Sequence, residues 1–225
     1  MRWKAVIFDL DDTLYPESAF VKSGFRAVAE WAEEQLGIPK DDGEATLLSY
    51  YDNGVRANTF NLWLENFKMP VEDVQACIEI YRAHIPKIHP FDDVHPTLAT
   101  LKPHCKLGIV SDGYESVQKN KWQALDLSSY FDKVVFSDMF GRENWKPSPV
   151  PFLSVLETLA ISPSLAVYVG DNPLKDFIAP HQLGMLAIQC KREGGEYGHL
   201  HPPTPQATPD ITISSLTQLM DVLSC

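Results

Sequence analysis

The stretch AVIFDLDDTL, residues 5–14, determines how the rest of the chain is interpreted, because four apolar residues lead directly into three carboxylates. The apolar run is too short for a helix and rich in residues that favour strands, so it predicts a fully buried strand. The carboxylates then follow the carboxyl end of that strand, which is where open α/β sheets bind their ligands. The stretch therefore predicts a binding site at one edge of a sheet.

Asp9 and Asp11 lie two residues apart, so one turn of the backbone can direct both carboxylates toward the same point. Holding like charges together is costly unless a cation or a shared proton compensates. The pair therefore indicates a metal site, and the alternative is a solvated acidic turn after an edge strand. Phe8 before the pair and Thr13 after it favour the site.

The composition of the 225 residues is ordinary for a globular protein, and the formal charge of −11 argues against non-specific nucleic-acid binding. The chain has no basic patch for a membrane surface, no run long enough to span a membrane and no visible signal peptide. Cys77, Cys105, Cys190 and Cys225 form no CxxC pair, which indicates free thiols in a reducing compartment. We therefore expect a cytoplasmic protein with no nucleic-acid or membrane partner.

Residues 16–90 show helical patterns with no strand between them. Apolar residues recur at helical spacing within about 21–36, 41–51, 60–67 and 71–81. Pro86 and Pro90 then stop helix formation. The aromatic residues of this segment are most simply the core of a small helical bundle.

From Asp92 onward, strand and helix patterns alternate. Strands are predicted at 106–110, 134–136, 166–169, 185–188 and 211–213, and helices at 93–102, 115–125, 150–160 and 176–183, with a closing helix at the end. Such alternation predicts a doubly wound, mostly parallel sheet. The stretch 193–209 is rich in Gly and Pro and has no periodicity, so we expect a long surface loop there.

These patterns together predict an α/β protein with two domains. Residues 1–15 and 91–225 would form a Rossmann-like catalytic core, and residues 16–90 an inserted α-helical bundle. The bundle leaves the sheet directly after the three carboxylates, so it can serve as a cap over the site.

Further polar residues fall at the carboxyl ends of predicted strands. Ser111, Asp112 and Gly113 can hold an anion with a hydroxyl and backbone N–H groups, although the same residues also suit a helix N-cap. Lys146, between Trp145 and a proline, is restrained enough to neutralise a carboxylate or a phosphate, and the alternative is an exposed loop lysine.

Asp171 directly follows another predicted strand, and Asp176 lies five residues later. These carboxylates can supply a metal ligand and an acceptor for metal-bound water. The alternative is a tight turn followed by a helix cap. Acid, hydroxyl, lysine and acid therefore occur in chain order at four strand ends of one sheet.

This order resembles the motifs of the haloacid dehalogenase superfamily, most of whose members are phosphatases. The first motif matches residues 9–13, the second Ser111 with Gly113, the third Lys146 and the fourth residues 170–176. The resemblance covers essentially the whole chain, including a helical cap between the first and second motifs. Asp112 stands where the family often has Asn, and Pro180 where it often has a small residue. We expect little effect of either on the chemistry.

The resemblance implies a Mg²⁺-dependent phosphatase that hydrolyses a small phosphate monoester, a phosphorylated metabolite, through an aspartyl-phosphate. Asp9 would be the nucleophile, and Asp11 the general acid and base. The metal would be held by Asp9, the backbone carbonyl of Asp11 and Asp171, with Asp176 orienting a metal-bound water. Asp12, Thr13, Ser111, Asp112, Gly113 and Lys146 would surround the transferring phosphoryl group.

Several alternatives remain open at this point. A phosphomutase of the same superfamily would differ mainly in its cap, whose candidate substrate contacts Arg56 and Asn58 also suit a solvated helix start. A phospho-accepting signalling domain uses similar residues around Mg²⁺, but it would be shorter and would carry its acceptor mid-chain. An inactive scaffold is a third alternative. Asp11 argues against a dehalogenase, because a halide leaves without a proton. We expect a monomer or a homodimer.

Overall fold

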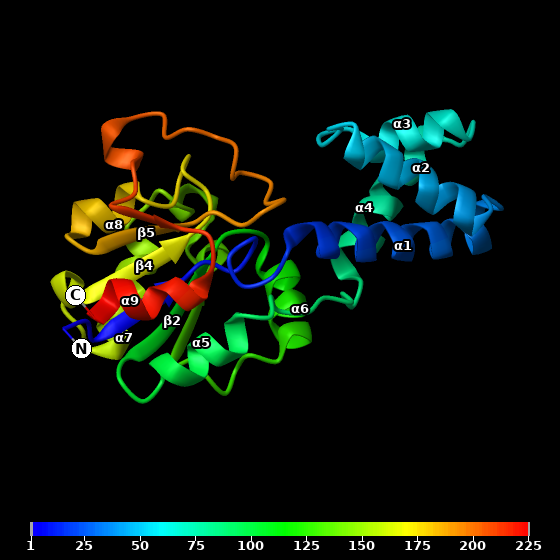
Figure 1. The fold of residues 1–225 in the computed structure, drawn as a ribbon. Coiled ribbons are helices and arrows are strands. Elements are labelled where there is room, and N and C mark those ends of the chain that lie inside the picture. Colours follow the sequence, from blue (N-terminus) through cyan, green and yellow to red (C-terminus); the bar gives the residue numbers. More distant parts are fainter. Residues whose placement is uncertain (1, 225) are drawn as a thin grey trace. The chain divides into compact units, whose positions relative to one another are not determined.

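The computed structural model describes residues 2–224 and divides into two compact units (Figure 1). The first unit combines Met1–Glu17 with His89–Cys225, and the second is the inserted segment Ser18–Ile88. Cys225 lies outside the described residues, so the expectation for its thiol stays a prediction. The other three cysteines are free and buried.

The first unit is built on a six-stranded sheet in which every neighbouring pair of strands is parallel. Its strands are β1 (Ala5–Phe8), β2 (Lys106–Ser111), β3 (Lys133–Phe136), β4 (Ala166–Gly170), β5 (Leu186–Cys190) and β6 (Ile211–Ile213), in the order β3-β2-β1-β4-β5-β6. The predicted fold class is therefore confirmed. The strand order reverses direction between β1 and β4, and such a switch point is where a doubly wound sheet binds its ligand.

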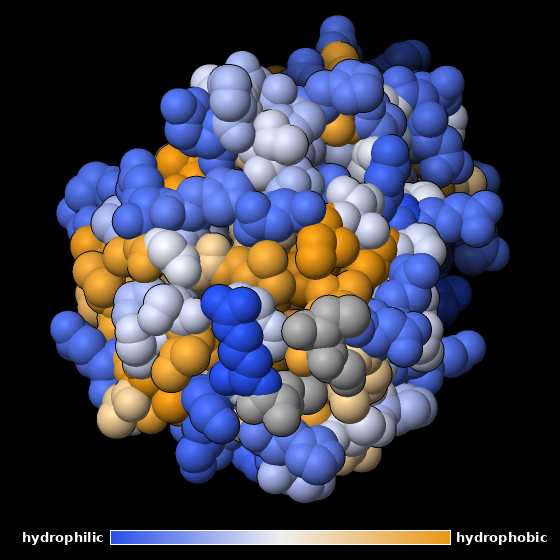
Figure 2. All heavy atoms as spheres, turned by 60° about the vertical axis from the view of Figure 1, so that its left-hand side comes forward, coloured by the Kyte–Doolittle hydropathy of each residue, from blue (hydrophilic) through white to orange (hydrophobic). Residues whose placement is uncertain are grey.

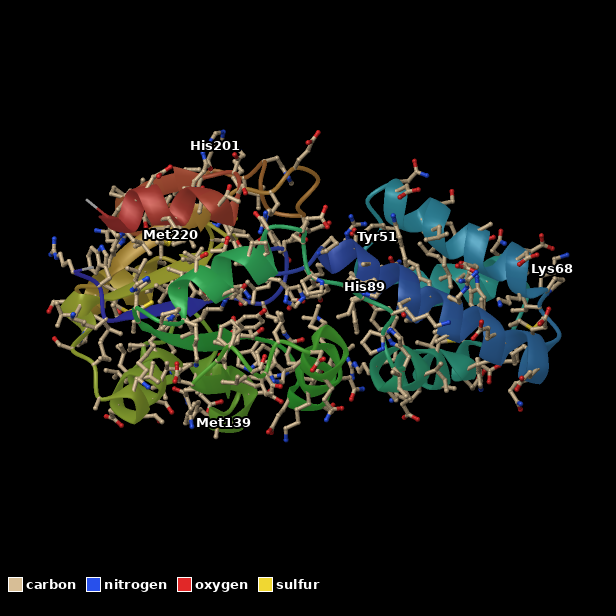
Figure 3. All side chains as sticks on the ribbon, turned by 60° about the horizontal axis from the view of Figure 1, so that its bottom comes forward. Tyr51, Lys68, His89, Met139, His201 and Met220 are labelled. Carbon is tan, nitrogen blue, oxygen red and sulfur yellow. The ribbon has the colours of Figure 1, made fainter. Side chains whose placement is uncertain are left out.

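The helices of the first unit cover both faces of this sheet. They are α5 (Val94–Leu101), α6 (Glu115–Leu125), α7 (Val150–Leu159), α8 (Ile178–Leu183) and α9 (Leu219–Ser224). Figure 3 shows α5 and α9 on one face and α7 on the other. All four residues of β1 are fully buried, as expected for a central strand covered on both sides.

The helix predicted at 176–183 begins two residues later than expected. Residues before α8 form turns instead, in which the backbone N–H of Asp176 donates to the carbonyl of Asn172 at 3.0 Å. The Asp176 carboxylate in turn accepts from the backbone N–H of Asn172 at 2.8 Å, which closes the turn. Pro180 lies in the first turn of α8, where a backbone N–H has no helical partner in any case.

The second unit consists of helices at the four predicted stretches. They are α1 (Glu17–Leu36), whose first residue belongs to the first unit, α2 (Lys40–Asp52), α3 (Thr59–Asn66) and α4 (Val74–Ala83), the last preceded by one 3-10 turn, Val71–Asp73. Trp63 is fully buried in this bundle, and its indole N–H donates to the carbonyl of Gly43 at 2.9 Å. The aromatic residues, among them Tyr51 labelled in Figure 3, do pack around the bundle core.

The face drawn in Figure 2 carries a band of hydrophobic residues, in orange, between rows of hydrophilic side chains, in blue. Exposed apolar side chains are ordinary on the surface of a globular protein. Among the described residues, no helix has both the length and the apolar composition needed to cross a membrane.

Gly108 in β2 gives a test of the packing between the sheet and α7. A Cβ at this position would lie 2.8 Å from Cγ1 of Val155 and 3.4 Å from Cγ1 of Ile7. We expect Gly108→Ala to lower the free energy of unfolding by about 1–3 kcal/mol, because the added methyl overpacks the core. Urea denaturation measures the change. Gly198→Ala is the control, since its Cβ would meet no atom closer than 3.5 Å. An equal loss of unfolding free energy in both variants would contradict the close packing of Gly108 against α7.

Candidate active site

The predicted site residues meet at the carboxyl edge of the sheet. Asp9 directly follows β1, and its N–H donates to the carbonyl of Val169 in β4 at 2.8 Å. Ser111 is the last residue of β2, and Asp171 directly follows β4. Asp9 and Asp171 line a cavity of about 110 Å³. Its lining residues are Asp9, Asp11, Glu17, Asp112, Gly113, Trp145, Asp171, Asn172, Lys175 and Tyr197.

The Lys146 side chain is fully buried and pairs with two carboxylates of this edge. Its Nζ is 2.9 Å from Oδ1 of Asp9 and 2.8 Å from Oδ1 of Asp176, and it donates to the Tyr168 hydroxyl at 3.0 Å. Burial alone would lower the pKa of Lys146, but the carboxylates of Asp176 and Asp9 outweigh it and raise the pKa well above its ordinary value. The side chain therefore stays charged and holds Asp9 in one orientation.

Asp9, Asp171 and Asp176 form a group that suits a metal ion. Each offers a carboxylate oxygen, and the three oxygens lie within 4.8 Å of one another. Burial raises the pKa of Asp9 to about 7 and that of Asp171 well above its ordinary value. Oδ2 of Asp171 is buried with no hydrogen-bond partner. Carboxylates with too little positive charge around them, all offering oxygen, fit a hard cation such as Mg²⁺.

The Asp11 carboxylate is directed to a different set of donors. It accepts from the Tyr15 hydroxyl, from Nε2 of Gln118 at 2.9 Å and from Nζ of Lys121 at 2.6 Å. Burial alone would raise the pKa of Asp11, but the Lys121 charge and these hydrogen bonds outweigh it and lower the pKa. The free protein thus holds Asp11 as a carboxylate, the form of a base, whereas the acid role implied by the resemblance needs a proton there.

Sequence reasoning did not identify Gln118 and Lys121. Both lie on α6, which begins directly after the Ser111–Gly113 stretch, and they are three residues apart on one helix face. That spacing was the available signal, because a helix leaving the carboxyl end of β2 turns one face toward the strand ends. Gln118 also donates to the Ser111 hydroxyl at 2.7 Å.

Asp112 acts through its side chain as well as its backbone. Oδ1 accepts from the backbone N–H of Lys146 at 3.1 Å, and Oδ2 pairs with Nζ of Lys175 at 3.0 Å. Burial alone would raise its pKa, but Lys146 and Lys175 outweigh it and lower the pKa. Lys175 is not among the predicted site residues, although its place beside Asp176 is a signal for it in the sequence. Gly113 has φ of +126°, and a Cβ there would lie 3.1 Å from Gln118.

Asp12 and Thr13 are not among the described residues that line the cavity. The Asp12 carboxylate accepts from the backbone N–H groups of Glu17 and Glu196, both at 2.8 Å. The carbonyl of Thr13 accepts from Nη2 of Arg192 at 3.0 Å, and its hydroxyl is buried with no hydrogen-bond partner. In this structure the Asp12 side chain holds the backbone at Glu17 and Glu196 in place. The phosphate-binding role expected from the resemblance stays a prediction.

Four more residues that line the cavity are not among the predicted site residues: Glu17, Trp145, Asn172 and Tyr197. Burial raises the pKa of Glu17 to about 8 and that of Tyr197 to about 12. The indole N–H of Trp145 donates to Oδ1 of Asp138 at 3.3 Å. No signal pointed to Tyr197, because its surroundings in the sequence have no periodicity.

The cap candidates Arg56 and Asn58 belong to the second unit, where both line a cavity of about 290 Å³ within that unit. The Arg56 guanidinium lies 4.0 Å from the ring centroid of Tyr51 and donates to the Tyr51 carbonyl at 2.7 Å. This arrangement is compatible with substrate contacts by Arg56 and Asn58 and equally with a solvated helix start.

The chain is similar to proteins of one family over most of its length. The sequence model of the haloacid dehalogenase-like hydrolases matches residues 6–189. Glyceraldehyde 3-phosphate phosphatase of Methanopyrus kandleri is 31% identical over 230 residues, which cover 98% of this chain and 97% of that protein. Phosphoglycolate phosphatase of Aquifex aeolicus is 31% identical over 175 residues, covering 75% and 76%. The structure of a 2-haloacid dehalogenase from Pseudomonas syringae gives a TM-score of 0.67 at 26% identity, covering 99% and 98%.

The contact between Lys121 and Asp11 predicts the effect of one substitution. Lys121→Met keeps the buried side chain at similar volume but removes the charge that favours the carboxylate, so the pKa of Asp11 should rise by at least ~1 unit. Carbon-detected NMR titration of the aspartate carboxyls measures it in the metal-free protein. Lys119→Met on the exposed part of α6, where Lys119 pairs with Glu115 at 2.7 Å, should leave that pKa unchanged. A pKa shift of equal size in both variants would refute the conclusion that the Lys121 charge lowers the pKa of Asp11.

Proposed function

This chain belongs to the haloacid dehalogenase-like hydrolase family, and on that premise we propose that it is a Mg²⁺-dependent phosphatase acting on small phosphate monoesters through an aspartyl-phosphate. The observation that carries the proposal is the presence of Asp11 beside Asp9 in one cavity, with donors arranged around its carboxylate. A leaving alkoxide needs a proton from such a group, whereas a halide does not. The second carboxylate therefore favours a phosphatase over a dehalogenase.

Asp9 is the proposed nucleophile. Lys146 fixes its Oδ1 at 2.9 Å, so the carboxylate has one orientation when the phosphate enters the cavity. Asp9 forms a bond from its carboxylate oxygen to phosphorus while the ester P–O bond breaks. Bound at Asp9 and Asp171, with Asp176 nearby, Mg²⁺ would neutralise the charge between the carboxylate and the phosphate dianion.

Asp11 is the proposed acid and base. A phosphate dianion placed beside Asp11 counters the effect of Lys121 and raises the pKa of Asp11, so the bound substrate itself favours the protonated form. Asp11 gives this proton to the leaving alkoxide. It then takes a proton from the water that attacks phosphorus, which breaks the bond to Asp9 and releases inorganic phosphate.

The phosphoryl oxygens would be held by groups around the same edge of the sheet. Gly113 and Asp112 line the cavity at the end of β2, Ser111 is the residue before them, and Nζ of Lys146 lies 2.9 Å from Oδ1 of Asp9. The role of Asp12 and Thr13 in this proposal is to shape the backbone between the nucleophile and Glu17.

We infer a small phosphorylated metabolite as the substrate, since the two similar phosphatases are named for glyceraldehyde 3-phosphate and phosphoglycolate. The cavity of about 110 Å³ in the first unit supports a ligand of that size. The second unit, which the chain enters at Ser18 directly after the acidic stretch, is proposed to act as the cap domain. The three free cysteines support a cytoplasmic location.

The function is tested by the turnover of p-nitrophenyl phosphate in Mg²⁺ and by the variant Asp9→Asn. We expect Asp9→Asn to lower kcat by at least ~1,000-fold, because the amide cannot attack phosphorus. Asp41→Asn makes the same chemical change at an exposed position of α2 and should retain full activity. Activity of Asp9→Asn above about a hundredth of the wild type would exclude Asp9 as the nucleophile.

Asp11→Asn separates proton transfer from a structural role. With p-nitrophenyl phosphate the leaving group needs little protonation, so the variant should form phospho-enzyme in a burst and then turn over slowly. With an alkyl phosphate even the first turnover should be slow, because the alkoxide needs the missing proton. Rapid-quench measurement of phospho-enzyme with both substrates tests this prediction. An equal loss of first-turnover rate for both substrates would show that Asp11 works only through folding or metal binding.

A further inference from the structure

Glu17 and Tyr197 are among the side chains of the catalytic cavity that have no part in the mechanism above. Glu17 stands at the start of α1, and Tyr197 lies in the segment that follows β5, 180 residues later in the chain. Both line the cavity together with Asp9 and Asp11, and both are half-buried. The fold thus brings a carboxyl group and a phenol from distant segments to the wall of one small cavity.

Asp12 holds the backbone at or next to both of these residues. Its Oδ1 accepts from the backbone N–H of Glu17 and its Oδ2 from that of Glu196, the neighbour of Tyr197, each at 2.8 Å. Asp12 is 4% exposed and has φ of +49°, so its carboxylate is turned away from solvent. A single buried carboxylate therefore fixes the backbone from which both side chains reach the cavity.

The segment that carries Tyr197 is anchored a second time at Arg192. Nη2 of Arg192 donates to the carbonyl of Thr13, and the guanidinium pairs with Asp93 at 2.7 Å and lies 4.2 Å from the ring centroid of Phe91. Arg192 is 9% exposed. The first part of the expected surface loop 193–209 is therefore tied to the residues that follow the nucleophile, while the exposed side chain of His201, labelled in Figure 3, marks its later part.

The charges around the cavity indicate what this wall contacts. Glu17 lines the same cavity as Asp11, the proposed donor of the proton to the leaving alkoxide, and its backbone N–H is held by Asp12, the residue after Asp11. Glu17 therefore lies on the leaving-group side of the cavity. Among the described lining residues, Lys175 carries the positive charge, and it is already paired with Asp112 at 3.0 Å.

We propose that Glu17 and Tyr197 form a leaving-group wall, positioned by Asp12, that selects phosphate esters of neutral hydroxyl- or carbonyl-bearing alcohols over esters that carry a carboxylate. This inference rests on the proposed phosphatase function. A carboxyl group and a phenol can exchange hydrogen bonds with hydroxyl and carbonyl groups. Whether protonated or ionised, Glu17 supplies no positive charge to pair with a carboxylate, and placing two carboxylates together is unfavourable.

The wild-type enzyme is tested with substrates matched in carbon number. Glycolaldehyde phosphate is compared with phosphoglycolate, and glycerol 1-phosphate with 3-phosphoglycerate, by kcat/KM in Mg²⁺. We expect the neutral member of each pair to be favoured by at least ~10-fold. A preference for the carboxylate members would overturn the inference while leaving the phosphatase function intact. Failure to turn over p-nitrophenyl phosphate as well as all four esters would instead overturn the proposed function, and the inference with it.

Glu17→Gln, compared with the wild type at pH 9, removes the charge that Glu17 carries above its pKa of about 8 and keeps the shape of the wall. We expect the preference for neutral esters to fall by at least ~5-fold, because kcat/KM for the carboxylate esters rises once the repulsion is removed. Glu193→Gln makes the same change at an exposed position of the segment that carries Tyr197 and should keep the wild-type preference. An unchanged preference in Glu17→Gln would refute the leaving-group wall.

Tyr197→Phe and Asp12→Asn test the other two residues. Tyr197→Phe should raise KM for the neutral esters more than it lowers kcat, because a hydrogen bond to the leaving group is lost. Asp12→Asn keeps one acceptor oxygen and loses the other, so one of the two backbone hydrogen bonds is lost. We therefore expect both the KM for the neutral esters and the preference for them over the carboxylate esters to change. A smaller amount of correctly folded enzyme would lower the apparent kcat and would leave the KM and the preference unchanged. If Asp12→Asn fails to fold, the Glu17→Gln comparison decides the proposal alone. A folded Asp12→Asn enzyme with wild-type KM and preference would show that Asp12 does not position the wall.

Discussion

The ion pairs of Lys146 are the interaction on which the site depends. A fully buried ammonium stands 2.9 Å from Asp9 and 2.8 Å from Asp176, so two carboxylates can be buried at the sheet edge with a positive charge between them. Removing one partner of a buried ion pair leaves an uncompensated charge that costs about 3–5 kcal/mol. Lys146 is therefore needed for the geometry of Asp9 before any chemistry is considered. Its hydrogen bond to Tyr168 of β4 ties this charge to the central sheet.

The parallel register explains why residues so distant in the chain meet at this point. Phe8 pairs with Ile109 on one side and with Val169 on the other, so the chain leaves β1, β2 and β4 at nearly the same level. Each exit supplies its own polar residues, and the switch in strand order opens the space between β1 and β4. The site is thus a consequence of the topology.

The features of the fold and site that could be predicted from the sequence are those whose interactions join residues close together in the chain. The buried strands and the acids at their ends are local patterns, because an apolar run followed by Asp9 or Asp171 is visible in a few residues. The contacts of Asp11 with Lys121, and of Asp12 with the Glu196 backbone, join segments more than 100 residues apart, so no pattern within either segment names the partner in the other. The late start of α8 has a similar cause, since the Asp176 side chain closes a turn where helix periodicity had suggested continuity.

Each of the three carboxylates in the stretch 9–13 has its own partners, which offset the repulsion between them. Asp9 is paired with Lys146, Asp11 is held by Lys121 with Gln118 and Tyr15, and Asp12 is satisfied by two backbone amides. The left-handed backbone of Asp12, with φ of +49°, turns its carboxylate away from the cavity that Asp9 and Asp11 line, and Asp tolerates this conformation better than most residues. Three neighbouring carboxylates can therefore be buried without sharing one counter-charge. Asp171, whose Oδ2 has no hydrogen-bond partner, offers that oxygen to a cation, together with oxygens of Asp9 and Asp176.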